Sequence, residues 1–219
     1  MIKTGDMAMR ICEIFTSIQG ESSYAGLPCT FIRVAGCNLR CTYCDTTYVY
    51  DEGAEVSLQE IMQNVRDAGT GLVEITGGEP LLQNEIHLLV SGLLEEGYTL
   101  LIETNGSQSI AGVDPRAVVI LDIKTPGSGM HEKMDLSNLA MIKPSAEIKF
   151  VITGREDYQW SKDMIRAYGL SEKCHILMSP AYGTLPPSDL ARWILEDRLN
   201  VRLNIQLHKY IFDPERRGV

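Results

Sequence analysis

The sequence has no long apolar segment and no excess of basic residues. Its apolar runs, such as Val118–Leu121, are far shorter than the roughly 20 residues that a membrane-spanning helix requires. Twenty Lys and Arg residues stand against 29 Asp and Glu residues, which gives a formal net charge of −9. That is the wrong sign for a chain that binds nucleic acid through its phosphates. These absences predict a soluble protein that acts on small molecules or protein partners, with no membrane or nucleic-acid partner.

The chain also lacks internal divisions and a targeting segment. No Pro/Gly/Ser-rich linker, low-complexity tract or repeat interrupts its 219 residues, so the sequence predicts a single domain over residues 1–219. The segment Met1–Arg10 has no apolar core of the kind that a signal peptide carries. We therefore expect a cytoplasmic protein, in which structural disulfides are not favoured.

Two hydrophobic periodicities alternate along the chain. The segment Ser57–Glu60 is a capping box that begins a helix with apolar residues at helical spacing, and Gly69 ends it. Asn84 is expected to cap a second helix, which Gly97 ends. Further helices are expected at Arg155–Tyr168 and Ser188–Leu199. Strands are expected at Cys29–Ala35, Leu72–Thr76, Tyr98–Ile102, Ala117–Ile123, Glu147–Ile152, Cys174–Met178 and Val201–Leu207. This order predicts an α/β fold with a parallel sheet and helices outside it.

The segments that follow these strands are rich in Gly, Cys and small polar or charged residues. They are Gly36–Tyr48, Thr76–Pro80, Glu103–Ser107, Asp122–Gly129 and Met178–Gly183. In parallel sheets of this kind, ligands bind at the carboxyl ends of the strands, where loops lie over a rigid base. The sequence therefore predicts that these five segments form the functional site.

Three of the six cysteines lie within eight residues, with the spacing C-x3-C-x2-C at Cys37, Cys41 and Cys44. In a reducing compartment this spacing indicates a metal site. Three thiolates do not complete a tetrahedral zinc site, whereas they leave one iron of a 4Fe-4S cluster open to an outside ligand. The alternatives to an iron-sulfur cluster are a zinc site completed by Cys29, Cys174 or a histidine, and three unrelated thiols.

The same loop resembles the signature of the radical S-adenosylmethionine (SAM) superfamily. The signature ends in an aromatic residue before the last cysteine, as does Cys37-Asn38-Leu39-Arg40-Cys41-Thr42-Tyr43-Cys44. A second superfamily feature, a glycine turn, is matched by Gly77-Gly78-Glu79-Pro80. In that superfamily the amine and carboxylate of SAM chelate the open iron, and the glycine turn meets the amino group. The chemistry agrees, because glycines let a ligand approach the backbone and the Glu79 carboxylate complements an ammonium.

More of the chain resembles the 7-carboxy-7-deazaguanine synthase family of that superfamily. The matching segments are Glu13–Ser22, Phe31–Leu39, Cys44–Thr46, Glu103–Gly106 and Gln206–Lys209. The resemblance implies a partial, open and shortened (β/α) barrel with a cluster-binding loop after the first core strand, in a homodimer. The implied reaction is the radical ring contraction of 6-carboxy-5,6,7,8-tetrahydropterin to 7-carboxy-7-deazaguanine with release of ammonia. This is a step of queuosine and deazapurine biosynthesis, in which SAM re-forms after each turnover.

The resemblance also implies cofactors and contact residues. A 4Fe-4S cluster would be held by Cys37, Cys41 and Cys44, and Mg2+ by Thr46 together with the substrate carboxylate and water. The implied SAM contacts are Tyr43, Cys44, Asp45, Gly78, Glu79, Glu103, Asn105, Asp122, Ile123, Lys124, Ser179, Pro180, Ala181 and Tyr182. The implied substrate contacts are Ile18, Gln19, Gly20, Glu21, Arg33, Thr76 and Pro214. A flavodoxin is the expected electron donor.

Residue chemistry adds detail to some of these positions. The Gln19 amide offers both donors and acceptors, as a guanine-like edge requires, and Arg33 can hold a carboxylate through two N–H groups. In some members of the family the chain ends at a proline whose carboxylate lies beside the substrate, whereas here Glu215–Val219 continue beyond Pro214. His208 and Lys209 are expected to be solvated charges.

Two other functions stay open on the sequence. An activase that places a glycyl radical on a partner protein shares the cysteine spacing and the glycine turn. It lacks the run Gln19-Gly20-Glu21 ahead of a strand that contains an arginine such as Arg33. A non-catalytic zinc-binding interaction module predicts zinc without iron, and it leaves the glycine turn without a purpose.

Overall fold

The computed structural model describes residues 7–219 and arranges nine strands in one sheet, in the order β3-β1-β2-β4-β5-β6-β7-β8-β9. The strands are β1 (Ala8–Ile18), β2 (Pro28–Val34), β3 (Ala54–Ser57), β4 (Leu72–Gly77), β5 (Thr99–Thr104), β6 (Val118–Ile123), β7 (Glu147–Ile152), β8 (His175–Pro180) and β9 (Arg202–Leu203). Neighbours from β2 to β9 are parallel, while β1 runs antiparallel to β2 and β3. Because β3 and β9 stand at opposite ends of the order, the barrel is open, which confirms the predicted fold class.

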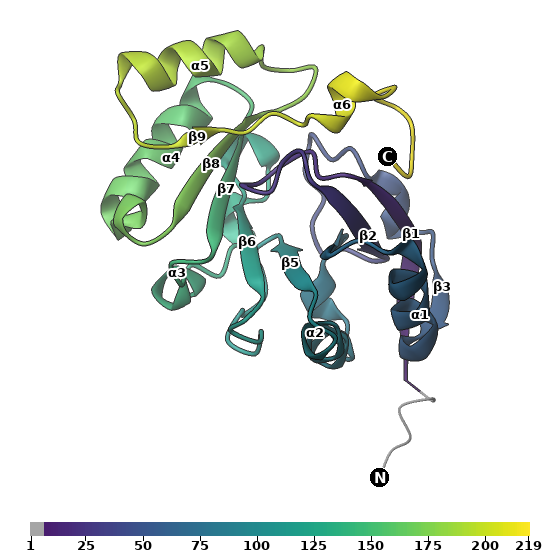
Figure 1. Cartoon of the computed structure of the whole chain (residues 1–219). Helices are drawn as coiled ribbons and strands as arrows, with labels where there is room; N and C mark the ends of the chain where they lie inside the picture. The colour runs from purple at the N-terminus through teal and green to yellow at the C-terminus, as the bar shows by residue number, and fades with distance from the viewer. Residues whose placement is uncertain (1–6) are drawn as a thin grey trace.

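The helices follow the strands along the chain (Figure 1). They are α1 (Leu58–Ala68), α2 (Ile86–Glu95), α3 (Asn138–Met141), α4 (Arg155–Tyr168), α5 (Pro187–Glu196) and α6 (His208–Ile211). None of the helices within residues 7–219 combines the length and apolar character needed to cross a bilayer. Residues 1–6, part of the segment from which the sequence predicts no signal peptide, lie outside the described residues.

The capping residue predicted for α1 is confirmed, and the one predicted for α2 is wrong. At α1 the prediction is confirmed, because the Ser57 hydroxyl accepts a hydrogen bond from the Glu60 N–H at 3.2 Å. At α2 the prediction that Asn84 caps the helix is wrong, since the capping position is Glu85 and no side chain caps it. A backbone turn satisfies the first helical N–H instead, which Ile86 donates to the Gln83 carbonyl at 3.3 Å.

The last predicted strand is shorter than expected. Of Val201–Leu207, only Arg202 and Leu203 form a strand, and both are exposed at the edge of the sheet. The chain then leaves the sheet and crosses from β9 towards β1, as the yellow segment of Figure 1 shows. An edge strand has a partner on one side alone, so a short pairing suffices here.

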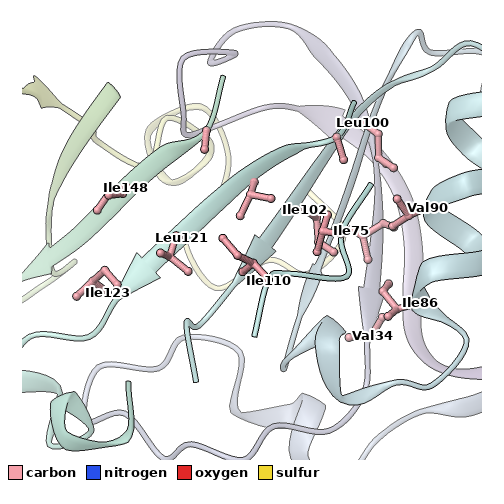
Figure 2. Close-up of a cluster of buried hydrophobic side chains, with 14 of the residues drawn as sticks. Val34, Ile75, Ile86, Val90, Leu100, Ile102, Ile110, Leu121, Ile123 and Ile148 are labelled. Carbon is pink, nitrogen blue, oxygen red and sulfur yellow. The ribbon is translucent and has the colours of Figure 1, made fainter. Parts of the chain in front are cut away.

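The two faces of the sheet differ in composition. Successive side chains of a strand point to opposite faces, so one set faces the helices and the other faces away from them. The helix-facing set, which includes Ile75, Ile102 and Leu121, forms the main hydrophobic core (Figure 2). The opposite face begins with a smaller apolar cluster, whose buried members are Cys29, Phe31, Leu72, Leu101, Val118 and Ile120. Further along the same face, polar residues replace the apolar ones and line a cleft.

Candidate functional site

An open cleft of about 1190 Å³ lies at the carboxyl ends of the parallel strands. Each of the five post-strand segments predicted to form the site contributes residues to its wall, so the fold brings all five together. The C-terminal segment also lines it, from Gln206 to Val219 with gaps. Of the site residues predicted from the sequence, all line this cleft except Glu79 and Ile123.

The cysteine loop is anchored on two sides by hydrogen bonds. Gly36, with φ of +88°, begins the loop and its carbonyl accepts the Glu79 N–H at 2.9 Å. A side chain at Gly78 would place its Cβ only 1.8 Å from that carbonyl oxygen, so the glycine turn packs directly on the loop. On the far side, Thr42 donates its hydroxyl to the Gly127 carbonyl at 2.7 Å. These contacts hold the loop between β4 and the segment after β6.

The three thiols fit a 4Fe-4S cluster. Cys37, Cys41 and Cys44 are half-buried and line the same cleft. Burial raises the pKa of Cys41, and the nearby Lys124 opposes this shift. Cys44 and Cys37 also raise the pKa of Cys41, so the three cysteines lie close enough to interact. Within residues 7–219, no three His, Cys, Asp or Glu side chains are arranged to hold a single metal ion. A cubane cluster needs no such arrangement, because each thiolate binds a different iron.

Hydrogen-bond donors around Cys37 also suit a thiolate ligand. Its sulfur accepts the Leu39 N–H at 3.4 Å and the Asn105 amide at 3.7 Å. Donors of this kind stabilise the anionic form of a cysteine and tune a bound cluster. Asn105 therefore connects the cysteine loop to the end of β5.

Glu79 does not face the cleft, contrary to the expectation that it meets an ammonium. Its side chain is fully buried, and its carboxylate accepts hydrogen bonds from the Leu81 N–H at 2.9 Å, the Thr104 hydroxyl at 2.8 Å and the Asn105 N–H at 2.7 Å. Burial raises its pKa. The carboxylate thus fixes the end of β5, where Asn105 begins the next loop.

Ile123 is the second predicted contact that the structure places elsewhere. Its side chain is completely buried in the main hydrophobic core between the sheet and the helices (Figure 2). Strand alternation explains this, because Asp122 and Lys124 on either side of it line the cleft. Only the backbone of Ile123 is left for a ligand contact.

Two buried polar atoms beside the cysteine loop lack partners. The Lys124 ammonium lies 2.7 Å from one oxygen of Asp122, and 5.9 Å from the centre of the Tyr43 ring. Although burial opposes its charge, Asp122 raises the pKa of Lys124. The other oxygen of Asp122 and the Tyr43 hydroxyl are buried without a hydrogen-bond partner among the described residues. Unpaired buried groups are unfavourable, so this pocket suits a polar ligand.

Arg33 presents part of its guanidinium to the cleft. Its Nε donates to the Glu13 carboxylate at 2.7 Å, and the Tyr48 hydroxyl donates to the same oxygen at 2.7 Å. This pair holds the guanidinium at 5.5 Å from the centre of the Phe15 ring. The two terminal nitrogens make no hydrogen bond within residues 7–219 and remain for a carboxylate. Glu13 and Tyr48, which orient Arg33, were not predicted from the sequence.

The Gln19 amide is committed to protein partners, contrary to the expectation for a pterin contact. Its nitrogen donates to Glu74 and its oxygen accepts the Glu21 N–H at 3.0 Å. The side chain is buried in the wall of the cleft, and the backbone N–H donates to the Leu27 carbonyl at 2.8 Å. Gln19 therefore shapes the turn that carries Glu21.

Two buried charged residues of the cleft were missed in the sequence. Glu74 in β4 faces it, and burial with the nearby Glu103 carboxylate raises the pKa of Glu74 to about 8. Lys149 in β7 faces it as well and bonds to Glu21 and Glu103. The signal was present, because each is a charged residue with apolar neighbours on both sides within a strand, which marks a polar position that faces into the protein.

The prediction that His208 and Lys209 are solvated is wrong. The Lys209 side chain is only 8% exposed, and its ammonium lies 2.7 Å from Asp45. Although burial opposes ionisation, this ammonium lowers the pKa of Asp45 to about 2. His208 packs so closely on Gly20 that a Cβ there would meet its Nδ1 at 2.2 Å. Helix α6 is thereby fixed over the cysteine loop and the turn after β1.

Comparison with known proteins identifies the family. Residues 31–114 match the family model of the Radical SAM superfamily. A 7-carboxy-7-deazaguanine synthase from Chlorobaculum tepidum is 47% identical over 214 residues, 96% of this chain and 97% of the relative. Another from Koribacter versatilis is 45% identical over 96% of this chain and 100% of its own length. The chain belongs to the 7-carboxy-7-deazaguanine synthase family.

Solved structures agree with this assignment. The crystal structure of QueE from Escherichia coli superposes with a TM-score of 0.76 and 25% identity over 94% of this chain and 96% of that one. That of Streptococcus suis SuiB bound to S-adenosylmethionine shares the fold alone, with a TM-score of 0.55 and 17% identity over 77% of this chain and 48% of that one. A 7-carboxy-7-deazaguanine synthase is a radical SAM enzyme that uses a 4Fe-4S cluster and SAM. The full-length match sets aside the activase and the zinc-binding module.

Proposed function

We propose that this chain acts as one domain to convert 6-carboxy-5,6,7,8-tetrahydropterin to 7-carboxy-7-deazaguanine and ammonia, in queuosine and deazapurine biosynthesis. The observation that carries the proposal is the pairing of three half-buried cysteines with an arginine whose terminal nitrogens face the same cleft. The first group suits the cofactor and the second suits the carboxylate of the substrate. The family relationship over nearly the whole chain supports the same reaction.

The cofactor half of the cleft lies around the cysteine loop. Cys37, Cys41 and Cys44 would hold the cluster, which when bound and reduced supplies the electron that cleaves SAM. The unpaired Asp122 oxygen and Tyr43 hydroxyl offer polar partners for SAM. The other proposed SAM contacts are Cys44, Asp45, Gly78, Glu103, Asn105, the Ile123 backbone, Lys124 and the segment from Ser179 to Tyr182.

The substrate half lies around Arg33 and the turn after β1. Arg33 would bind the substrate carboxylate through its terminal nitrogens, because Glu13 occupies the Nε alone. Glu21 would accept hydrogen bonds from the pterin edge, and the backbone of Ile18–Gly20 would lie along it. Thr76 already donates to Glu103 at 3.2 Å, so its hydroxyl oxygen remains an acceptor for the substrate.

The C-terminal segment bears on the substrate half as well. Pro214 lines the cleft together with Glu215–Val219. The Arg217 guanidinium lies 2.8 Å from Glu52 and 3.7 Å from the centre of the Tyr48 ring, beside the group that orients Arg33. We propose that this segment covers the substrate from the side opposite the sheet.

Mg2+, the oligomer and the electron donor are also proposals. Thr46 lies in the cleft with its hydroxyl 3.9 Å from the Cys44 sulfur, and it would bind Mg2+ with the substrate carboxylate and water completing the shell. A homodimer, a flavodoxin-type donor and a cytoplasmic location rest on the family resemblance.

The test is an anaerobic assay of the purified chain. After iron analysis, the enzyme is incubated with reductant, SAM, Mg2+ and the carboxytetrahydropterin, and the products are identified by mass spectrometry. Formation of 7-carboxy-7-deazaguanine supports the proposal. Absence of this product despite an intact cluster and SAM cleavage would overturn the substrate assignment while leaving the superfamily intact. Omission of Mg2+ tests the Thr46 proposal separately.

A further inference from the structure

Lys149 lies between two carboxylates that come from distant parts of the chain. Its ammonium nitrogen is 2.5 Å from Glu21 Oε2 and 2.6 Å from Glu103 Oε1, and its side chain is only 8% exposed. Glu21 lies in the turn after β1, Glu103 lies near the carboxyl end of β5, and Lys149 is in the middle of β7. The ammonium therefore connects the turn after β1 with strands β5 and β7 on the cleft face of the sheet.

The bridge stabilises charge on both sides. Although burial opposes the charged form, Glu103 and Glu21 raise the pKa of Lys149 well above its usual value. Burial also opposes ionisation of Glu21, and Lys149 nonetheless lowers the pKa of that carboxyl. The charged or titratable groups that face the ammonium from the surrounding elements are Glu103, Glu21, Asp122, Glu74, Tyr43, Asp45 and His208. Without the ammonium, Glu21 and Glu103 would lack their shared counter-ion.

The remaining oxygens of the two carboxylates extend the bridge in both directions. Glu103 Oε2 accepts the Thr76 hydroxyl at 3.2 Å, on the side of β4. Glu21 Oε1 accepts the Gln206 amide at 2.8 Å, and the same amide nitrogen lies 3.2 Å from Asp45 beside the last cysteine. Lys149 is thus the central member of a polar chain that runs from β4 to the C-terminal segment.

We propose that Lys149 is a positioning residue that fixes Glu21 and Glu103 and thereby couples binding of the pterin to binding of SAM. The proposal rests on the proposed function, in which Glu21 belongs to the substrate half of the cleft and Glu103 to the SAM half. Neither carboxylate contacts the other directly, so the shared ammonium is what sets their spacing. When bound SAM fixes Glu103, the ammonium of Lys149 would hold the Glu21 carboxylate in the position that binds the pterin.

The experiment compares Lys149→Met with Lys149→Arg in the cluster-loaded full chain. Binding of SAM and of the pterin is measured by anaerobic equilibrium dialysis, each alone and in the presence of the other, and the KM and kcat for the pterin are measured in parallel. Lys149→Met should raise the pterin KM by about 30-fold, as expected for a buried charge left unpaired. It should also abolish any increase in pterin affinity that SAM produces in the wild type. Lys149→Arg should keep most of the wild-type pterin KM and most of the increase in pterin affinity that SAM produces.

A matched control separates positioning from folding. Lys162 in α4 pairs with Asp197 at 2.6 Å with 17% of its side chain exposed, and it lies outside the cleft. Lys162→Met removes an ion pair of similar length and should lower the Tm while leaving pterin and SAM affinities within about twofold of the wild type.

A double variant tests the bridge itself. Adding Glu21→Gln to Lys149→Met removes the carboxylate left without its counter-ion, so the double variant should have a higher Tm than Lys149→Met yet no better pterin affinity. If Lys149→Met does not fold, Lys149→Arg and Glu21→Gln decide the question through the same binding measurements.

The proposal is overturned if Lys149→Met leaves the coupling between the two ligands unchanged, or if Lys149→Arg is as defective as Lys149→Met. The proposal is also overturned if Lys162→Met changes the pterin and SAM affinities as much as Lys149→Met does. Failure of the proposed function would be seen in the wild type, as SAM cleavage without deazaguanine. In that case SAM affinity and the Tm of the double variant still test the bridge.

Discussion

The two faces of the parallel sheet use the same strands for different purposes. Ile75, Ile102 and Leu121 face the helices and are buried in the main hydrophobic core. Their direct neighbours in sequence, Glu74, Glu103 and Asp122, line the cleft on the other face. Because side chains alternate along a strand, the structural and chemical roles are separated at the level of single residues.

The cleft face is also divided along the strands. Its first part is an apolar cluster that includes Leu101 and Ile120, and its last part is charged. The apolar part closes the floor, so the charged residues above it are only partly hydrated and must pair with one another, as Lys149 does with Glu21 and Glu103. Changes on the helix-facing side should therefore alter stability, and changes on the cleft side should alter ligand binding.

The largest expected effect comes from the cysteine loop in the wall of the cleft. Cys41→Ala removes one of three cluster ligands and should abolish both bound iron and product formation, while the far-UV circular dichroism spectrum stays that of a folded chain. Cys174→Ala is the matched control. That thiol does not line the cleft, burial raises its pKa to about 11, and its loss should leave the iron content unchanged. Equal iron loss in both variants would contradict the assignment.

On the helix-facing side, Ile75→Ala should reduce stability without changing ligand binding. Ile75 is completely buried in the main core, so the free energy of unfolding should fall by about 2–4 kcal/mol. The measurement is urea denaturation of the cluster-loaded chain, with the pterin KM measured at a temperature where the variant stays folded. A large rise in KM at full folding would show that the two faces are not separate.

On the cleft side, Arg33→Ala should reduce substrate use far more than SAM cleavage. The loss of a charge-assisted carboxylate contact should raise the pterin KM by about 100-fold. Uncoupled formation of 5′-deoxyadenosine in the absence of pterin, measured by chromatography, should change by less than about threefold. The opposite pattern would place Arg33 on the SAM side. Arg33→Lys should recover only part of the affinity, because lysine lacks the planar fork.

The smallest expected effect is a pH dependence of stability caused by Glu74. Burial and the nearby Glu103 raise the pKa of Glu74 from 4.5 to about 8. Between these values the native chain keeps a proton that the unfolded chain has released. The free energy of unfolding therefore falls as pH rises, by at most about 1.4 kcal/mol per pH unit.

Glu74→Gln removes this titration and keeps an oxygen that can accept the Gln19 amide. The variant should lose less stability than the wild type between about pH 5.5 and about pH 7.5, as measured by urea denaturation at each pH. Parallel curves for the two proteins would mean that Glu74 is already ionised in the native state.

Elements set by local sequence were predictable. The capping box at Ser57 and the apolar periodicity of α4 define their helices within the segments themselves. Asn84 failed as a cap because a backbone turn from Gln83 took its place. The short edge strands β3 and β9 carry mostly exposed side chains, so no alternation pointed to their bounds.

The candidate site was predictable as a set of loops but not as a set of partners. The cysteine spacing and the post-strand segments located the cleft. The pairing of Lys149 with Glu21 joins residues 128 positions apart, and that of Lys209 with Asp45 joins residues 164 apart. Such partners are determined by how strands and the C-terminal segment meet in space. Glu79 is a residue that the sequence placed in the site, yet its side chain is buried among protein partners and does not line the cleft.

In the proposed function, the charged end of the cleft face binds a carboxytetrahydropterin beside a SAM-cleaving cluster. The most direct measurement is the ratio of 7-carboxy-7-deazaguanine formed to SAM consumed by the anaerobic, cluster-loaded enzyme under multiple turnover. The amount of product should be well above the amount of SAM consumed, because SAM re-forms after each cycle. Steady SAM consumption without deazaguanine would contradict it.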